Sequence, residues 1–309
     1  MATSPKVTVF GPHPLLAITI EALTSAGGDD IHAHAAGQGV WVARMASELG
    51  ASPILCGFIG GETGAVLRPL LDQMDVEMRL VETATASGSY VHDRRSGERE
   101  PVAQSASMPP SRHEIDELFS STVAAALDSG VLALCGPYPS EALPLEIYGN
   151  LVTDVKANGT PVIVDLSPPR LDSALEGGPD LVKINDWELA SYIEGPVDSE
   201  ERMRAAAQRL LEAGAGSVII TRAEEPAMVL RGDDAWELIP PRFERGSREG
   251  CGDSMMGGLA ACIAAGLEWE ETLRIGAAAG AANFLRHGLG SGSRAVIEDL
   301  AQRVELRRL

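Results

Sequence analysis

The chain has 309 residues, 45% of them hydrophobic, which is enough to bury a large α/β core. Its 44 acidic and 25 basic residues give a formal net charge of −19, and no basic block of the kind that grips a nucleic-acid backbone is present. Nucleic acid is therefore not an expected partner. A small anionic ligand can still bind, because a glycine loop and one or two cations can hold it locally.

The cysteine pattern and the N-terminal residues indicate a cytoplasmic protein. Four cysteines are present, with neither a Cys-x-x-Cys pair nor the His/Cys spacing of a metal site, so we expect reduced, mostly buried thiols. The N-terminal residues lack the apolar stretch of a signal peptide, and no apolar run approaches the length that spans a bilayer. We expect no membrane partner.

Hydrophobic periodicity predicts alternating strands and helices along most of the chain. The expected elements are, in order, strand 6–10, helix 40–49, strand 53–58, helix 63–74, helix 112–127, strand 131–135, helix 143–157, strand 162–165, strand 181–183, helix 205–213, strand 217–221, strands 227–230 and 235–238, the helix around Asp253, and helix 272–285. Residues 15–36 are expected to be irregular, with a turn at 27–30. This alternation predicts a mainly parallel central sheet with helices on both faces.

Residues 86–105 follow a different pattern. Two mostly polar strands, 87–92 and 100–104, flank a turn at 94–97, which predicts a β-hairpin lying over a site as a flap. Neither internal repeats nor a low-complexity linker is visible, so we expect one domain spanning residues 1–309. Ligands of parallel sheets bind beyond the carboxyl ends of the strands, where Gly136, Asp165, Asn185 and Thr221 fall.

The sequence Gly250-Cys251-Gly252-Asp253-Ser254 stands at the start of a predicted helix. Its glycines allow the backbone N–H groups to turn inward and form an anion cradle with the first turn of the helix. Asp253 is well placed there to accept a proton from a substrate hydroxyl. An anion cradle beside a general base suits phosphoryl transfer to an alcohol. Taken alone, the same residues also fit an ordinary helix N-cap.

Four pieces of sequence, this motif among them, occur in a recognisable order. They are 37–44 together with 57–61, then 180–188, 218–221 and 250–254. They resemble the ribokinase-like PfkB carbohydrate kinases, most closely the branch of 1-phosphofructokinase and tagatose-6-phosphate kinase. The resemblance implies an α/β fold with a mainly parallel central sheet, helices on both faces and a small β lid formed by residues about 15–36 and 86–105. It also implies transfer of the ATP γ-phosphate, with Asp253 as base and the amides of Gly250, Cys251 and Gly252 holding the phosphoryl charge.

The resemblance implies that the residues at the end of strand 181–183 bind the phosphates of ATP. Asn185 and Glu188 would order Mg²⁺ through its waters, which suits a hard cation, and Lys183 would contact phosphate. A helix capping box is the alternative for the first two residues. A strand-end cation is the alternative for Lys183.

The resemblance also assigns the walls beside the nucleotide. Thr221 and Arg222 begin the loop along ATP, although residues 222–226 depart from the glycine-bearing pattern of the family. Ala277, Gly280 and Ala281 match the wall beside adenine, and they fit close helix packing equally well.

The acceptor side departs from the family pattern. Ala17 stands where the family has a sugar-binding aspartate, Gln38 replaces a lysine, Trp41 replaces an asparagine, and Ala86 replaces the lid arginine that meets a substrate phosphate. Each charge-assisted contact contributes about 1.5–3 kcal/mol to binding, so the loss of two cations should lower the affinity for a sugar phosphate by orders of magnitude. The expected acceptor contacts are Gly37, Gln38, Gly39, Trp41, Tyr90 and Asp253.

Two acceptor features have alternative interpretations. Trp41 is either an aromatic platform for the acceptor or a packing residue on its helix. Arg94, Arg95 and Arg99 form either a solvated turn or a shifted anion clamp, and the clamp would restore a phosphosugar substrate.

Three functions remain open from the sequence. The first is a kinase whose acceptor is a sugar or sugar-like molecule other than a plain fructose or tagatose phosphate. The second is an ordinary hexose-phosphate kinase, and the third is a nucleotide-binding sensor with little catalysis. In the family the lid often pairs with that of a second subunit, which makes a homodimer a further expectation.

Overall fold

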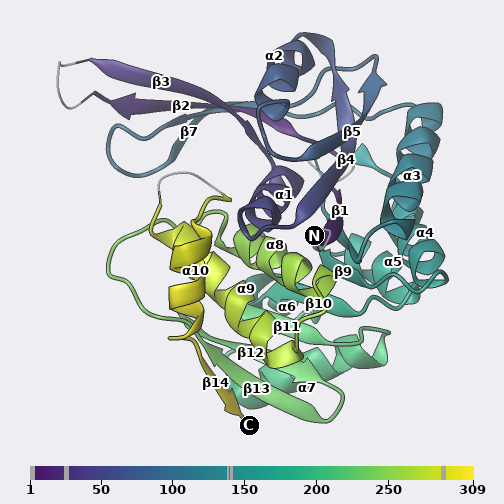
Figure 1. The fold of residues 1–309 in the computed structure, drawn as a ribbon, viewed down its shortest axis with the longest axis vertical. Helices are drawn as coiled ribbons and strands as arrows, with labels where there is room; N and C mark the ends of the chain where they lie inside the picture. Colours follow the sequence, from purple (N-terminus) through teal and green to yellow (C-terminus); the bar gives the residue numbers. More distant parts are fainter. Residues whose placement is uncertain (1–3, 24–27, 138, 140–141, 287–289) are drawn as a thin grey trace.

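The computed structural model describes residues 4–23, 28–137, 139, 142–286 and 290–309, and this part of the chain contains two β-sheets (Figure 1). The larger sheet is built from β1 (Lys6–Phe10), β4 (Ser52–Gly60), β5 (Glu77–Thr83), β8 (Val131–Cys135), β9 (Val162–Asp165), β10 (Leu181–Asn185), β11 (Val218–Arg222), β12 (Glu225–Arg231), β13 (Asp234–Ile239) and β14 (Glu305–Arg308). Its spatial order is β14-β13-β12-β11-β10-β9-β8-β1-β4-β5. The strands from β11 to β5 are parallel, whereas β12, β13 and β14 pair antiparallel.

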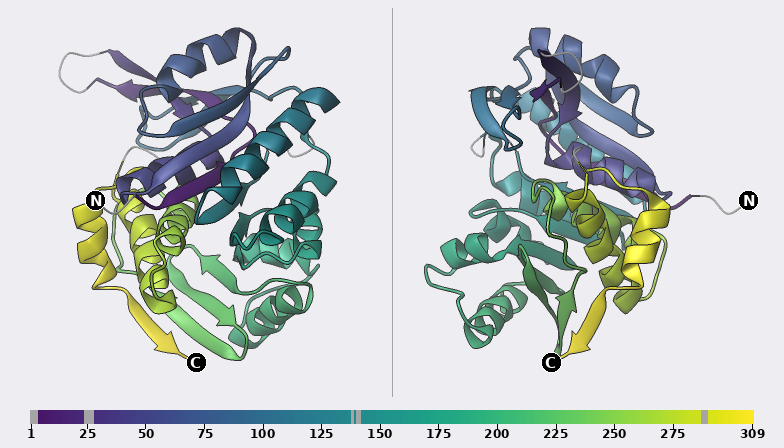
Figure 2. Two further views of the ribbon diagram at one scale, coloured as in Figure 1. Left: turned by 45° about the vertical axis from the view of Figure 1, so that its right-hand side comes forward. Right: turned by 90° about the vertical axis from the view of Figure 1, so that its left-hand side faces the viewer.

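Helices cover both faces of this sheet, as predicted (Figure 2). They are α1 (Gln38–Glu48), α2 (Gly61–Leu71), α3 (Arg112–Leu127), α4 (Glu146–Lys156), α5 (Arg170–Glu176), α6 (Asp186–Tyr192), α7 (Glu200–Glu212), α8 (Cys251–Ala264), α9 (Trp269–Phe284) and α10 (Arg294–Ala301). Side chains of a strand alternate between two hydrophobic clusters: in β8, Val131 and Ala133 pack with α1, α8 and α9, while Leu132 and Leu134 pack with α3, α4 and α5. Burial on both sides explains the nearly continuous apolar strands.

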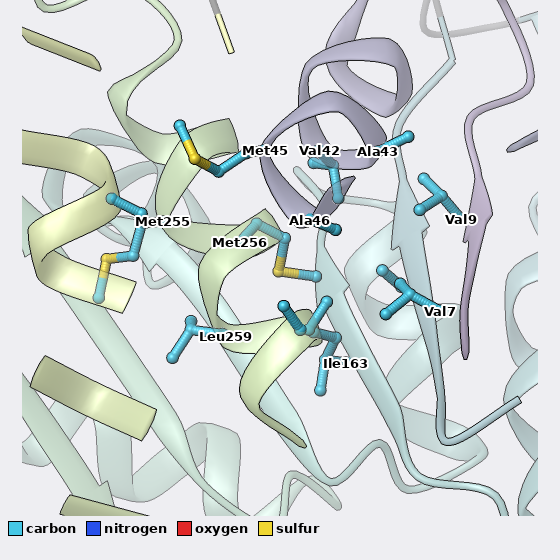
Figure 3. Close-up of a cluster of buried hydrophobic side chains, with 14 of the residues drawn as sticks. Val7, Val9, Val42, Ala43, Met45, Ala46, Ile163, Met255, Met256 and Leu259 are labelled. Carbon is cyan, nitrogen blue, oxygen red and sulfur yellow. The ribbon is translucent and has the colours of Figure 1, made fainter. Parts of the chain in front are cut away.

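Helix α8 lies in the middle of one face, between α1 and α9 (Figure 3). Met256 and Leu259 of α8 pack in the same cluster as Val42 of α1 and Val7 of β1. The first turn of α8 is therefore held by core packing on several sides, and it emerges at the end of the sheet where β9 and β10 terminate.

The smaller sheet consists of β2 (Leu15–Ala22), β3 (Asp29–Ala36), β6 (Ser89–Asp93) and β7 (Glu100–Ser105), in the order β3-β2-β6-β7. It projects from one side of the molecule (Figure 1). The expected hairpin 86–105 is confirmed as β6 and β7. The expectation that residues 15–36 are irregular is wrong, because β2 and β3 form a regular antiparallel pair. Of the predicted turn at 27–30, Gly27 lies outside the described residues, and Asp29 and Asp30 belong to β3.

This prediction failed because only one end of the β2–β3 pair is packed into a hydrophobic cluster. Leu15 and Ala17 are buried there, whereas most of β3 is half-buried or exposed, so its polar residues carry little hydrophobic periodicity. Among the described residues, no helix is long and apolar enough to cross a bilayer.

Candidate active site

The turn before α8 has the geometry that its glycines predict. Gly250 is the N-cap residue, in the left-handed region with φ 71° and ψ 0°, where a side chain would be strained. A Cβ on Gly252 would lie 3.0 Å from the Lys183 Nζ, so this ammonium packs directly against the turn. Asp253 is the third residue of α8. It is therefore not the helix N-cap that was the alternative interpretation of the motif.

The environment of Asp253 suits a general base that works near neutral pH. Burial, and next the Asp165 carboxylate, raise the pKa of Asp253 from 3.8 to about 7, although Lys183 and a hydrogen bond from Gln38 act in the opposite direction. A pKa close to the working pH gives a base that is both ionised and able to hold the proton it takes. Strongly shifted carboxyl groups of this kind cluster at functional sites.

Lys183 forms a buried ion pair behind this turn. Its Nζ lies 2.7 Å from the Asp165 Oδ2, and the two side chains are 5% and 9% exposed. Burial alone would lower the pKa of Lys183, but the attraction of Asp165 raises it above its usual value. The adjacent parallel strands β9 and β10 set the two side chains side by side. Lys183 is thus not a solvated cation at a strand end. Its ammonium pairs with Asp165 and lies against the turn at Gly252.

Asn185 and Glu188 form a capping box at the start of α6, which was the alternative interpretation of this pair. The Asn185 side chain accepts from the Glu188 N–H at 2.8 Å, and the Glu188 carboxylate accepts from the Asn185 N–H at 3.3 Å. Burial, then the Asp165 charge, raise the pKa of Glu188.

The charges around this point favour a divalent cation. The charge of Asp165 raises the pKa of both Glu188 and Asp253, and the charge of Glu188 also raises the pKa of Asp253. The Lys183 ammonium lowers both pKa values. Within the described ranges, no three His, Cys, Asp or Glu side chains are close enough to hold a metal ion directly. The side-chain oxygen atoms of Asn185 and Glu188 are ligands of the kind that a hard cation such as Mg²⁺ accepts.

A cavity of about 440 Å³ opens beside the turn, a size typical of small-molecule sites. Nine residues predicted for the nucleotide or the catalytic turn line it: Lys183, Asn185, Thr221, Arg222, Cys251, Gly252, Ala277, Gly280 and Ala281. Sequence reasoning missed further lining residues, among them Trp187, Pro240, Pro241, Arg242, Phe243, Arg248 and Phe284. Trp187 is 69% exposed at this cavity, a position that hydrophobic patterning does not reveal.

Gln38 links the expected acceptor contacts to Asp253. Its Oε1 accepts from the Gly136 N–H at 2.8 Å, its Nε2 lies 3.4 Å from the Asp165 carbonyl oxygen, and its side chain hydrogen-bonds Asp253. A Cβ on the following residue, Gly39, would lie 2.4 Å from the Gly11 Cα, so glycine is required at this close approach. Gly37 precedes Gln38 as the N-cap of α1.

Trp41 and Tyr90 lie at the base of the smaller sheet. Trp41 is half-buried and packs against a cluster of Leu15, Ala17, Ala36 and Tyr90. This contact supports the packing interpretation of Trp41. Tyr90 is 7% exposed.

The predicted arginine turn divides into two parts. Arg95 is half exposed and pairs with Asp93 and Asp29 of the same sheet, as expected for a solvated turn. That expectation is wrong for Arg94, whose side chain is 19% exposed and pairs with Glu21, and for Arg99, whose side chain is 13% exposed and pairs with Glu249. Glu249 is the residue before Gly250, so Arg99 reaches from the smaller sheet to the turn that carries Asp253.

A comparison with known families decides the assignment. A profile described as "pfkB family carbohydrate kinase" matches residues 17–295. The chain belongs to the pfkB family of carbohydrate kinases. It is therefore a sugar kinase, a phosphotransferase with a hydroxyl acceptor.

Individual relatives of this pfkB kinase agree with the assignment. The chain is 30% identical to the ATP-dependent 6-phosphofructokinase isozyme 2 of Escherichia coli, over 82% of each chain, and 25% identical to the 1-phosphofructokinase of Haemophilus influenzae, over 88% of this chain and 87% of the relative. Solved structures of Escherichia coli phosphofructokinase-2 superpose on it. The potassium complex gives a TM-score of 0.83 at 25% identity, over 98% and 99% of the two chains. A tetrameric inhibited form gives 0.82 at 26% identity, over 97% and 99%.

Proposed function

We propose that this pfkB kinase transfers the γ-phosphoryl group of ATP to a hydroxyl group of a sugar or sugar-like molecule, with Asp253 as the general base. The observation that carries the proposal is the position of Asp253, which lies one residue beyond Gly252, a lining residue of the large cavity. As the acceptor oxygen bonds to phosphorus, its proton passes to the Asp253 carboxylate and the bond to ADP breaks. The amides of Gly250 and Gly252 would face the developing negative charge, whereas the Cys251 N–H donates to the Arg248 carbonyl oxygen at 3.3 Å.

The cavity residues support ATP as donor. Thr221 and Arg222 would flank the nucleotide, and Ala277, Gly280 and Ala281 would leave room for its base. Mg²⁺, when bound, would neutralise phosphate charge. Asn185 and Glu188 would hold its waters, and Lys183 would add a fixed positive charge beneath the turn.

The acceptor pocket supports a substrate other than a plain fructose or tagatose phosphate. Gln38, rather than a lysine, hydrogen-bonds Asp253, and Ala17 is buried in an apolar cluster with Tyr90. Gly37 and the half-buried Trp41 would complete the wall on the side of α1, and Gly39 would set their position through its close contact with Gly11. Gln38 brings no positive charge to this pocket, which suits a neutral polyol better than a dianion.

An ordinary hexose-phosphate kinase is the second candidate. The names of the relatives favour it, since they include 1-phosphofructokinases and an ATP-dependent 6-phosphofructokinase. Arg99, which is half-buried and donates to the Tyr90 Oη, is the cation that would serve as a replacement clamp. Membership of a kinase family leaves the third possibility, a nucleotide sensor, without support.

We also infer that residues 1–309 act as one domain, with the smaller sheet as a lid, and that two copies pair through this sheet. Ile31 on β3 is 66% exposed and Val102 on β7 is 60% exposed, and both strands are sheet edges. Exposed edge strands that each carry an apolar side chain favour pairing with another strand. The tetrameric form of a related phosphofructokinase-2 shows that a protein of this fold assembles.

A thermal-shift screen tests the proposed reaction, because a ligand that binds the folded state raises the melting temperature. We expect stabilisation by MgATP and a further rise when a neutral sugar or polyol is added. A further rise with fructose 1-phosphate, fructose 6-phosphate or tagatose 6-phosphate instead would favour the second candidate. An unchanged melting temperature with MgATP would contradict the donor assignment.

A further inference from the structure

Arg99, the residue that precedes β7, is held by three side chains. Its Nε donates to the His92 Nδ1, its Nη2 donates to the Tyr90 Oη at 2.9 Å, and its Nη1 pairs with the Glu249 Oε2. The Tyr90 and His92 rings stack, with centroids 4.5 Å apart. The guanidinium is thus fixed at the base of the smaller sheet, beside the side chains expected to meet the acceptor.

Glu249 stands between this arginine and the catalytic turn. Its backbone oxygen accepts from the Asn283 Nδ2 at 2.7 Å, which fixes the main chain just before Gly250. Its side chain is 46% exposed, so the carboxylate can swing into solvent without becoming a buried unpaired charge. The chain therefore places an anion at the boundary between the smaller sheet and the turn that carries Asp253.

This carboxylate changes what Arg99 can bind. An arginine held in a fixed orientation binds phosphate strongly. Arg99 could therefore substitute for the two cations of the family pattern that are replaced here by Gln38 and Ala86. Glu249 already occupies one edge of the guanidinium and cancels its charge. A dianionic acceptor must either displace Glu249 or lie against a like charge, whereas a neutral acceptor meets no such repulsion.

We propose that Glu249 determines acceptor specificity by neutralising Arg99, so that the site selects against acceptors that carry a phosphate group at this position. The proposal rests on the proposed kinase function and specifies the chemistry of its acceptor. Glu249 and Arg99 act on binding, whereas Asp253 acts on transfer, so the two can be tested separately.

The test compares Glu249→Gln, Arg99→Gln and the double variant, with Arg95→Gln as a matched control from the same hairpin. Fructose 6-phosphate and fructose are the probes, and their affinities are measured by calorimetry in the presence of MgADP. We expect Glu249→Gln to bind fructose 6-phosphate about tenfold or more tightly than the unmodified chain, while its affinity for fructose changes less than about threefold. The double variant should lose the gain, because the gain requires the released guanidinium. Arg95→Gln should match the unmodified chain with both probes.

Three results would overturn the proposal. They are an unchanged or undetectable affinity of Glu249→Gln for fructose 6-phosphate, an equal change for both probes, and a gain that persists in the double variant. An equal loss for both probes would mean that the Arg99–Glu249 pair only braces the smaller sheet. Failure of the proposed kinase function would appear differently, as the absence of phosphoryl transfer from MgATP to any acceptor by the unmodified chain, and it would leave the measured selectivity of binding unaffected.

Discussion

At the scale of single residues, the protonation of Asp253 controls when the proposed base can act. Its pKa of about 7 results mainly from burial and from Asp165, and only the ionised form can take a proton. We expect kcat/KM to fall about tenfold for each pH unit below pH 7 and to level off above it. A pH–rate profile between pH 5 and 9 measures this, and a profile that stays flat down to pH 5 would contradict the assignment.

The raised pKa of Asp253 also makes the free energy of unfolding depend on pH. Its pKa is 3.8 before burial and about 7 in the folded chain, so between these values the folded state binds more protons than the unfolded state. The contribution of this group to stability therefore decreases as pH rises through that window. We expect Asp253→Asn to be more stable than the unmodified chain at pH 8, by about 1–3 kcal/mol, with a smaller difference at pH 5. Urea denaturation at both pH values measures this; the opposite order of stabilities at pH 8 would count against a raised pKa of Asp253.

Local motifs made part of the site predictable from the sequence. Gly250 and Asp253 are close in the chain, so the turn and its base could be predicted together, and Gly250 has the expected left-handed backbone. The Arg99–Glu249 pair joins positions 150 residues apart and could not be predicted. The partnership of Lys183 with Asp165 likewise depends on the pairing of two strands, which no local pattern specifies.

At the scale of elements, α8 depends on close packing against α1. A Cβ on Gly257 would lie 2.5 Å from the Val42 carbonyl oxygen and 2.8 Å from the Met45 Cβ, and a backbone oxygen cannot move aside easily. We expect Gly257→Ala to lose about 1–3 kcal/mol of stability and to lower kcat, because α8 carries Asp253. Urea midpoints and initial rates measure both effects. Gly195→Ala is the control, since its nearest neighbour would be 3.8 Å away; equal midpoints for the two variants would contradict this account.

The strength of each boundary signal explains which elements were predicted well. Helix α3 matches the predicted range 112–127, and its start is fixed by a capping box of Ser111 and Glu114. Strands β8 and β9 also match, because both are fully buried. The edge strand β5, the short helix α5 and the C-terminal α10 and β14 were missed. The partly exposed residues of β5 and β14 follow no clear period, whereas α5 and α10 are amphipathic but span only seven and eight residues.

At the scale of the whole molecule, the edges of the smaller sheet predict assembly. We expect the unmodified chain to be a dimer, and we expect Ile31→Lys combined with Val102→Lys to be monomeric, since charged residues on an edge block strand pairing. Sedimentation velocity measures the mass of each. Val66→Lys, on the half-exposed face of α2, is the matched control and should remain dimeric. A monomeric unmodified chain, or a double variant that still dimerises, would contradict the interface.

The fold of the whole chain was more predictable than its substrate. Buried strands and helices specify the large sheet, and the family assignment agrees with it. The residues proposed to select the acceptor, Gln38, Arg99 and Glu249, instead come from three distant parts of the chain.

The most direct test of the central claim compares Asp253→Asn with the unmodified chain in two assays. One measures phosphoryl transfer from MgATP to a pool of neutral sugars, polyols and hexose phosphates, and the other measures MgATP affinity by calorimetry. We predict that transfer falls by about two to four orders of magnitude while MgATP affinity changes less than about threefold, because asparagine retains the shape of the side chain but not its basicity. Transfer at an undiminished rate would show that Asp253 is not the base.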